Sequence, residues 1–327
     1  MNVRSRSAQL LLTLLSATVL HAEATPSKAL LVLSKTERTL AIVDPSNLKV
    51  IARVPVGPDP HEVIASSDGK LAFVSNYGGG AYNTLAVIDL VDQKALPSVD
   101  LGALRAPHGL FFAGGKAWFT AEAAKVIGSY DPATKKVDLV LGTGQNGTHM
   151  IYVTDDLKRI ITSNIGSGTM TVIDKTNNSW DTTVVPVGRR AEGFDVSPDG
   201  KEIWAANAQD GTISIIDMAT KKVTQTLSAD VEGANRLKFT PDGKLVFVST
   251  LRGTDVSIFD AATRAVKKRV NIGHGAAGIQ MQPDGVRVFV ACTPDGYVSI
   301  LDLKSLEVTG RLDAGKQPDG MAWAVGQ

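Results

Sequence analysis

Short apolar runs bounded by turn-forming residues follow one another from residue 29 to the end of the chain. Three of them read KLAFVSN (70–76), KEIWAAN (201–207) and KLVFVST (244–250), and each is rich in β-branched and aromatic residues. Gly, Asp, Asn and Pro cluster between the runs, which is typical of strands joined by tight turns. No stretch after residue 24 carries the 3.6-residue period of an amphipathic helix. The pattern therefore predicts an all-β protein.

The strand pattern repeats, and an aspartate marks its period. Runs such as AVID, TVID, SIID and SILD end in aspartates spaced 42 to 45 residues apart, at Asp44, Asp89, Asp131, Asp174, Asp217, Asp260 and Asp302. An aspartate before a turn accepts hydrogen bonds from backbone N–H groups two residues on, so we interpret all seven as scaffold. Four strands per unit of this length predict the blade of a β-propeller.

The two ends of the chain complete each other. The first unit starts with ALLVLSKTERTLAIVD (29–44) and lacks the strand that opens the other units, whereas the C-terminal segment KQPDGMAWAVGQ (316–327) supplies that strand alone. We therefore predict seven four-stranded blades in a single domain, residues 25–327, in which the last segment becomes the innermost strand of blade one. Such closure removes the exposed sheet edges of an open array.

These repeats resemble the YVTN-type, YncE-like family of exported seven-bladed propellers. The strand motif of the family corresponds here to FVSN (73–76), ITSN (161–164) and WAAN (204–207), and the resemblance covers residues 29–327. It implies the fold and leaves the activity open, because members of the family bind different ligands.

The first 24 residues have the pattern of a secretory signal. Arg4 and Arg6 precede an apolar stretch from Leu10 to Leu20, and Ala22-Glu23-Ala24 forms a small-x-small cleavage site. Such a segment is too short and wrongly flanked for a membrane anchor. We expect an exported protein, located in a bacterial periplasm, whose mature chain begins at Thr25.

Composition narrows the possible partners. The formal net charge is +1, with acidic and basic residues interspersed, so no global field favours nucleic acid or a membrane surface. Aromatic residues are sparse, which also disfavours stacking of single-stranded nucleic acid. A single cysteine, Cys292, excludes an internal disulfide.

One position of the repeat varies where a scaffold position would be uniform. It lies at the top of each predicted innermost strand, and around the ring it reads His61, His108, His149, Glu192, Asn235, Ala277 and Asp319. Seven blades converge at this end of the central channel, so three histidines from consecutive blades are expected to lie close together. We call these seven residues the mouth ring.

The three histidines predict a metal site. Neutral imidazole is a common ligand of zinc and copper, and three imidazoles leave an open coordination position. We therefore predict a divalent transition metal, copper or zinc, held by His61, His108 and His149. Glu122 or Glu192 could orient one ring or complete the shell.

Other residues of the same face are candidates for ligand contact. From the mouth ring and the loops above it we expect the ligand to touch Glu192, Asn235, Arg236, Asp319, Tyr77 and Arg190. Arg105, Arg189 and Arg252 lie in top-face segments as well, so we predict a locally basic mouth that attracts a small molecule or an anionic ligand.

Three alternatives stay open. Glu122 and His108 could form the acid–base pair of a metal-assisted lyase or of a lactonase or other hydrolase, a chemistry that some exported propellers perform at this face. The histidines could instead only satisfy loop carbonyls or water in the channel. The mouth could also be incidental to a protein-interaction platform. Cys292 beside His274 is a candidate copper ligand, with apolar packing as its alternative.

Overall fold

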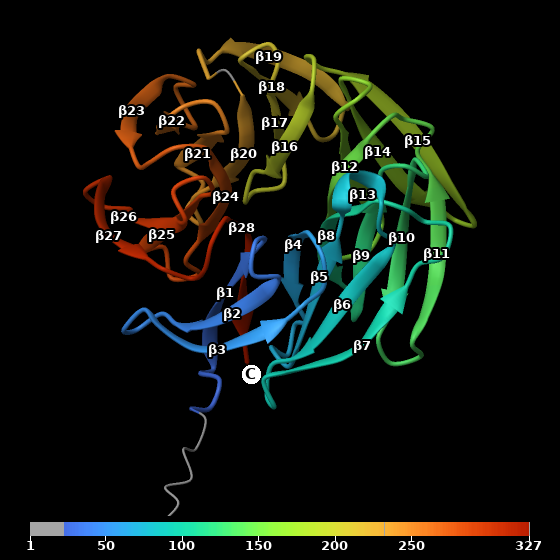
Figure 1. Cartoon of the computed structure of the whole chain (residues 1–327). Helices are drawn as coiled ribbons and strands as arrows, with labels where there is room; N and C mark the ends of the chain where they lie inside the picture. Colours follow the sequence, from blue (N-terminus) through green and yellow to red (C-terminus); the bar gives the residue numbers. More distant parts are fainter. Residues whose placement is uncertain (1–22, 232, 327) are drawn as a thin grey trace, which may run out of the picture.

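The computed structural model describes residues 23–231 and 233–326. The predicted signal segment therefore lies almost wholly outside the described residues. The described residues form seven antiparallel four-stranded sheets around a central axis (Figure 1). This confirms the seven-bladed propeller predicted from the repeat.

Each blade after the first takes four consecutive strands. Blade two holds β4 (Pro60–Ala65), β5 (Leu71–Asn76), β6 (Thr84–Asp89) and β7 (Lys94–Asp100). Blade three holds β8 (Pro107–Ala113), β9 (Lys116–Ala121), β10 (Val126–Asp131) and β11 (Lys136–Gly142). Blade four holds β12 (Thr148–Val153), β13 (Arg159–Asn164), β14 (Thr169–Thr176) and β15 (Ser179–Pro186).

The remaining blades repeat this order. Blade five holds β16 (Ala191–Val196), β17 (Glu202–Asn207), β18 (Thr212–Asp217) and β19 (Lys222–Ser228). Blade six holds β20 (Ala234–Phe239), β21 (Leu245–Thr250), β22 (Asp255–Asp260) and β23 (Val266–Asn271). Blade seven holds β24 (Ala276–Met281), β25 (Arg287–Cys292), β26 (Tyr297–Asp302) and β27 (Glu307–Leu312).

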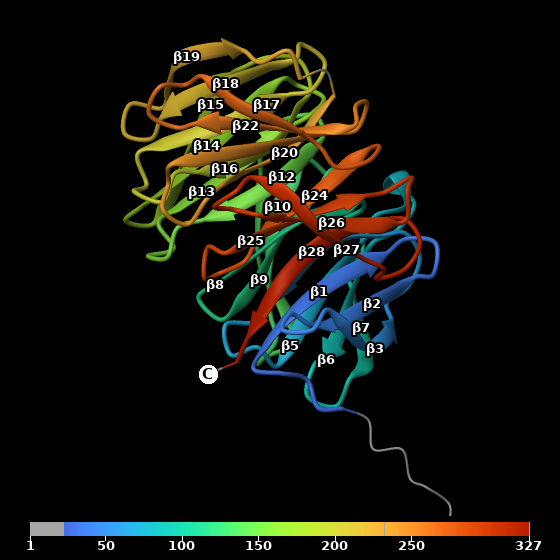
Figure 2. The same cartoon turned by 90° about the vertical axis from the view of Figure 1, so that its left-hand side faces the viewer.

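Blade one closes the ring as predicted. Its strands are β1 (Lys28–Ser34), β2 (Thr39–Asp44) and β3 (Lys49–Pro55), with β28 (Pro318–Val325) as the innermost strand. Figure 2 shows β28 alongside β1. In this pair Leu30 lies opposite Trp323 and Val32 opposite Met321. The first and last strands of the chain thus share one sheet, and the innermost strands surround the centre of Figure 1.

Apolar side chains fill the spaces between neighbouring blades. Between blades two and three, Phe73, Leu85 and Phe119 are fully buried in one cluster, and equivalent clusters recur around the ring. The outermost strands alternate exposed and half-buried residues, as β11 does, because they have a neighbour on one side only. Apart from the 3₁₀ turn η1 (Gly78–Gly80), the described residues form strands and loops, and none of them forms a helix able to cross a membrane.

Six of the seven repeat aspartates have the predicted scaffold role. Asp217, for example, accepts a 2.7 Å hydrogen bond from the N–H of Thr220 in the following turn. Asp174 is the exception. It lies inside β14, where the hairpin to β15 runs two residues further, and it forms ion pairs with Arg159 and Lys221 instead.

Candidate functional site

The mouth ring lies on seven β-bulges. In blade two, Pro60 pairs with Asn76 and Val63 with Val74, so His61 and Glu62 together oppose the single residue Ser75. The same shift of register occurs in the innermost strand of every blade. A bulge places an extra residue in one strand and redirects its side chains. The ring side chains are therefore released from the alternation of the strand and gather at the mouth of the channel.

Buried hydroxyl groups fix four of these bulges to the next blade, and the fourth is that of Ser249 between Arg236 and Ala277. Thr120, which opposes the bulge of blade three, accepts a 2.9 Å hydrogen bond from the N–H of Gly109 and donates a 2.7 Å bond to the carbonyl of His149. Ser75 links Glu62 to the carbonyl of His108 in the same way, and Ser163 links Met150 to the carbonyl of Glu192. Each hydroxyl thus positions the ring residue of its neighbour.

Two of the ring histidines converge with a glutamate from the loop after β9. The imidazoles of His108 and His149 stack with centroids 3.7 Å apart, and a carboxylate oxygen of Glu122 contacts Nδ1 of His149. Potential ligand atoms of His108, Glu122 and His149 all lie within 4.8 Å of one another. Both histidines are buried and Glu122 is largely so, which makes this group a candidate metal centre.

Two further side chains extend the candidate centre. Tyr77 donates a 2.6 Å hydrogen bond to the second carboxylate oxygen of Glu122. On the opposite side, Nε2 of His149 lies 3.2 Å from Glu192, at an ion-pair distance but without the alignment of a hydrogen bond. His149 is thus held between two carboxylates, one of which is oriented by a phenol.

The three rings differ in protonation because their neighbours differ. Burial lowers the pKa of His108 well below 6.5, and the neighbouring His149 and His61 lower it further. Burial also lowers the pKa of His149, but the contacts with Glu122 and Glu192 outweigh it and raise the pKa of this ring. Burial, followed by Glu122, raises the pKa of Tyr77. A neutral His108 therefore lies beside a readily protonated His149.

His108 is unusual because nothing in the protein satisfies its ring. The residue is 1% exposed, and neither ring nitrogen has a hydrogen-bond partner among the described residues. A buried polar atom without a partner costs about 1–3 kcal/mol. Such atoms in a native fold call for a bound water or ion.

His61 lies beside this group and has a different contact. Its ring centroid is 4.3 Å from that of His108, but its Nδ1 faces the ammonium of Lys35 at 2.5 Å. Lys35 also binds Asp319 at 3.0 Å and Asp59 at 3.2 Å. His61 is therefore near the predicted metal position without belonging to the group of converging ligand atoms.

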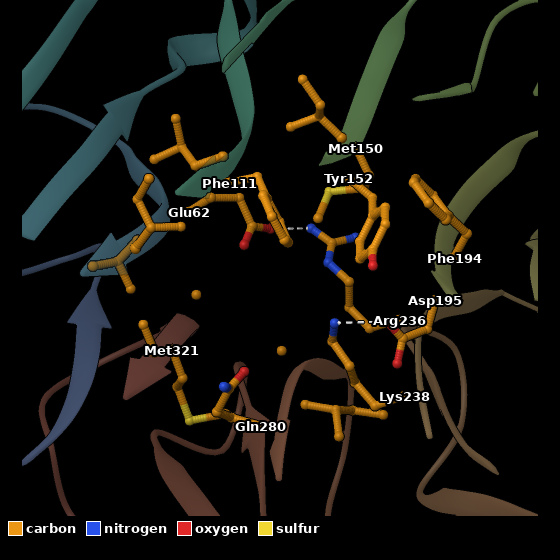
Figure 3. A pocket seen from close by; sticks show the side chains of 18 residues that line it. Glu62, Phe111, Met150, Tyr152, Phe194, Asp195, Arg236, Lys238, Gln280 and Met321 are labelled. Atoms are coloured by element: carbon orange, nitrogen blue, oxygen red, sulfur yellow. Dashed lines mark hydrogen bonds and ion pairs between the residues drawn. The ribbon is translucent and has the colours of Figure 1, made fainter. Parts of the chain in front are cut away.

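An ion pair crosses the channel below the ring. Arg236 reaches from β20 to Glu62 on β4 (Figure 3). Its guanidinium also donates to the side chain of Asn235 at 3.1 Å. Above this pair is a mouth cavity of 360 Å³ lined by Lys35, His61, Glu192 and Asp319. Below it is a channel cavity of 240 Å³ lined in part by Tyr152 and Lys238. The pair separates the two cavities.

The prediction of a basic mouth is wrong. Arg236 pairs with Glu62, Arg189 pairs with Asp210, and Arg105 donates to the carbonyls of Gly80 and Ala81. Around the mouth, five carboxylates face three basic side chains, namely Asp59, Glu62, Glu122, Glu192 and Asp319 against Lys35, Arg190 and Arg236. These eight groups carry a formal excess of two negative charges, which falls to one when His149 is protonated. Arginines in loops do not predict the local field, because the chain supplies carboxylates to pair with them.

The structure also changes two predicted pairs. The carboxylate of Glu122 contacts His149 and Tyr77, whereas no hydrogen bond joins it to His108 in the described residues. Cys292 is fully buried and packs in an apolar cluster, while His274 is 71% exposed and pairs with Asp295. Cys292 and His274 therefore form no site. Arg190, half-exposed, lies 3.6 Å from Glu192 at the rim.

Sequence reasoning missed Lys35 and the bulge-linking hydroxyls. Aligning Lys35 with the strand-end asparagines is wrong, because Ser34 holds that position; Lys35 is the next residue, as Tyr77 and Glu122 are in blades two and three. Ser75 and Ser163 stand at one position of the repeat, before the strand-end asparagine, but the role of these hydroxyls and of Thr120 depends on the register of the bulge.

Comparisons with known proteins support the fold and leave the chemistry open. Residues 143–279 match the family described as Cytochrome D1 heme domain, which is less than half of the chain. No curated protein matches the sequence. The resemblance to the YVTN-type family stays a prediction.

Several solved structures share the architecture. A functionally unknown protein from Desulfotomaculum acetoxidans has a TM-score of 0.75 at 14% identity, covering 90% of this chain and 98% of its own. A candidate 6-phosphogluconolactonase from Bacteroides uniformis has a TM-score of 0.74 at 14% identity, covering 90% and 99%. A dihydro-heme d1 dehydrogenase has a TM-score of 0.65 at 16% identity, covering 91% and 75%. Identities this low show a shared fold alone.

Proposed function

We propose that this protein is an exported, periplasmic propeller that binds a divalent transition metal through His108, Glu122 and His149 and presents it to a small ligand in the mouth cavity. The observation that carries this proposal is His108. It is a neutral, buried imidazole with no partner for either nitrogen among the described residues, 3.7 Å from a second imidazole and close to a carboxylate. A metal ion would satisfy the ring, and two imidazoles with one carboxylate are a common donor set for zinc.

The charge of the mouth supports a cation. Five carboxylates against three basic side chains leave an excess of negative charge even when His149 is protonated, and a cation would reduce it. Buried charges are stable only when they are compensated. The contacts of Tyr77 and Glu192 with the centre would orient Glu122 and His149, in the way that outer residues orient metal ligands.

Elemental analysis tests this proposal. Protein purified from its native compartment should contain close to one equivalent of zinc or copper, and His108→Ala should remove it. His274→Ala is the matched control, because His274 is an exposed histidine of the same face. Less than a tenth of an equivalent in the wild type, unchanged by His108→Ala, would refute the metal proposal. Part of the chain matches a heme domain, so a haem is a rival occupant of the site. Intense visible absorption of a haem in the same sample would mean that the occupant is a haem and not a single metal ion.

A second candidate function is a metal-assisted lyase or a lactonase or other hydrolase. The hydrogen-bonded series Tyr77–Glu122–His149 favours it, because a carboxylate between a phenol and an imidazole can take up and release a proton. Glu122 then acts with His149, and His108 serves as a ligand. Activity against panels of lactones and esters that Glu122→Gln abolishes, while the metal and the fold are retained, would select this function. No turnover of either panel by metal-loaded protein would reject it.

Export is a separate proposal and rests on residues 1–24 of the sequence. N-terminal sequencing of the protein from the periplasmic fraction should start at Thr25. An intact Met1 in the cytoplasmic fraction would contradict it.

A further inference from the structure

The contact between Lys35 and His61 fixes which nitrogen of the ring carries its proton. Lys35 lies between Asp319 and Asp59, and a lysine flanked by two carboxylates is an ammonium. An ammonium donates hydrogen bonds and cannot accept them. The Nδ1 of His61, 2.5 Å from Lys35 Nζ, is therefore the acceptor, and the proton of the neutral ring is on Nε2.

The remaining nitrogen is available to a ligand. No hydrogen bond to Nε2 of His61 occurs within the described part of the chain, and it is not among the fully buried atoms without partners. The side chain is 20% exposed and lines the mouth cavity. Because Nδ1 accepts a hydrogen bond from the ammonium of Lys35, it carries a lone pair and the ring is neutral. His61 thus offers the cavity an N–H group.

The cavity has two kinds of wall. Asn235 and Arg236 place further hydrogen-bonding groups beside His61, next to the carboxylates of Glu192 and Asp319. Leu251, Ala277 and Pro294 form the other side, and Leu251 is 48% exposed at the rim. A leucine exposed beside a polar cavity gains free energy when an apolar group covers it. The walls therefore suit a molecule with an oxygen acceptor at one end and an apolar group at the other.

We propose that the mouth cavity binds a small aliphatic carboxylate beside the metal centre, with one carboxylate oxygen accepting the Nε2 proton of His61 and the apolar group covering Leu251 and Pro294. The inference rests on the proposed metal function, and it gives His61 the role of a ligand-binding donor in place of the metal ligand predicted from sequence. Once a cation has reduced the excess negative charge of the mouth, a monocarboxylate meets Arg236 and His61 as donors.

The first experiment determines which ring nitrogen of His61 carries the proton in metal-free protein. Nitrogen-15 NMR of the imidazoles should show His61 protonated on Nε2 in the wild type. Lys35→Met should produce a mixture of the two tautomers, because the group that selects the tautomer is gone. Lys316→Met is the matched control, since Lys316 is an exposed lysine of the same rim, and it should leave the spectrum unchanged. A proton on Nδ1 in the wild type would overturn the assignment.

The second experiment separates ligand binding from metal binding. Protein loaded with Co²⁺ is titrated with acetate and with 3-methylbutanoate, and the visible bands of the metal report occupancy. We expect 3-methylbutanoate to bind about tenfold more tightly, since the added methyl and methylene groups are only partly buried. His61→Ala should weaken both about tenfold or more, as expected for a lost hydrogen bond to a charged group, while the amount of bound Co²⁺ stays constant.

The failures are distinguishable. Loss of Co²⁺ in His61→Ala would make His61 a metal ligand and overturn this inference while preserving the proposed function. Full Co²⁺ with unchanged carboxylate affinity would overturn it as well. If the wild type binds no metal, the proposed function fails. Titration calorimetry of 3-methylbutanoate with metal-free wild type and with metal-free His61→Ala then tests the carboxylate site independently of the metal. Equal affinity of the two proteins, or no binding to the wild type, would overturn the carboxylate site.

Discussion

At the scale of single residues, the candidate site depends on differences among side chains that occupy one position of the repeat. His61, His108 and His149 are equivalent in sequence, yet one contacts an ammonium, one has no partner and one lies between carboxylates. The sequence could predict that three imidazoles gather at the mouth, because the repeat places them there. It could not predict which of them converge on a metal, because Lys35 and Glu122 come from the ends of other strands and meet the rings only after folding.

The unsatisfied ring of His108 makes a prediction about stability. In metal-free protein, His108→Phe should leave the free energy of unfolding unchanged or raise it by up to about 1 kcal/mol, because it removes two polar atoms that lack partners. Zn²⁺ should raise the melting temperature of the wild type and not that of the variant, since only a native state that binds the ion is stabilised by it. Thermal unfolding with and without Zn²⁺ measures both. A loss of more than about 2 kcal/mol without metal would mean that His108 is held by water and has a structural role.

At the scale of elements, the bulges decide where chemistry can occur. The alternation of apolar and polar residues predicted the strands and their turns, and the structure confirms them. The bulges were not predictable, because an inserted residue in β4, β8 or β12 changes the pairing with the next strand without changing the composition of the run. Residues 61, 108 and 149 could be aligned by the repeat, but their release from the ladder depends on that register.

The hydroxyl of Thr120 provides a test of this element. Thr120→Val keeps the shape of the side chain and leaves the N–H of Gly109 and the carbonyl of His149 without their partner. We expect a loss of about 1–3 kcal/mol in the free energy of unfolding and a metal affinity about tenfold lower. Ser249→Ala is the control, because Ser249 makes the same link between Arg236 and Ala277, away from the proposed ligands. It should lose stability and keep metal affinity. Equal effects of both variants on metal affinity would show that the link does not position His149.

At the scale of the whole molecule, a small contribution to stability from one blade recurs in other blades, because the blades repeat the same pattern. The closure of blade one by β28 and the seven sheets followed from the sequence, because the missing first strand and the surplus last strand were visible there. The electrostatic field of the mouth could not be predicted from the sequence, since it depends on ion pairs such as Glu62 with Arg236, which join residues 174 positions apart.

The repeated turn aspartates predict how the molecule responds to acid. Hydrogen bonds from the following turn hold the pKa values of Asp44, Asp217, Asp260 and Asp302 below 3.8. A carboxylate with a lowered pKa in the folded state stabilises it above the unfolded value and loses that effect as pH falls through the folded value. Stability measured by urea unfolding should therefore be flat near pH 5 and fall steeply below about pH 4.

Asp260→Asn tests the origin of this dependence. The amide oxygen of asparagine can accept the same turn hydrogen bonds but does not titrate. The variant should remain folded and show a shallower fall of stability with acid. Asp181→Asn, at an exposed carboxylate without hydrogen bonds among the described residues, should keep the wild-type slope. An unchanged slope in Asp260→Asn would show that the turn carboxylates do not drive acid unfolding.

The bulges have one more consequence. Where a hydroxyl of the neighbouring strand anchors the backbone of a bulge, the blade does not depend on the side chain at its tip, as the alanine at position 277 illustrates. Such positions around one opening can be exchanged at small cost in fold. A new specificity on this scaffold needs only a few substitutions, which makes the opening a natural starting point for design.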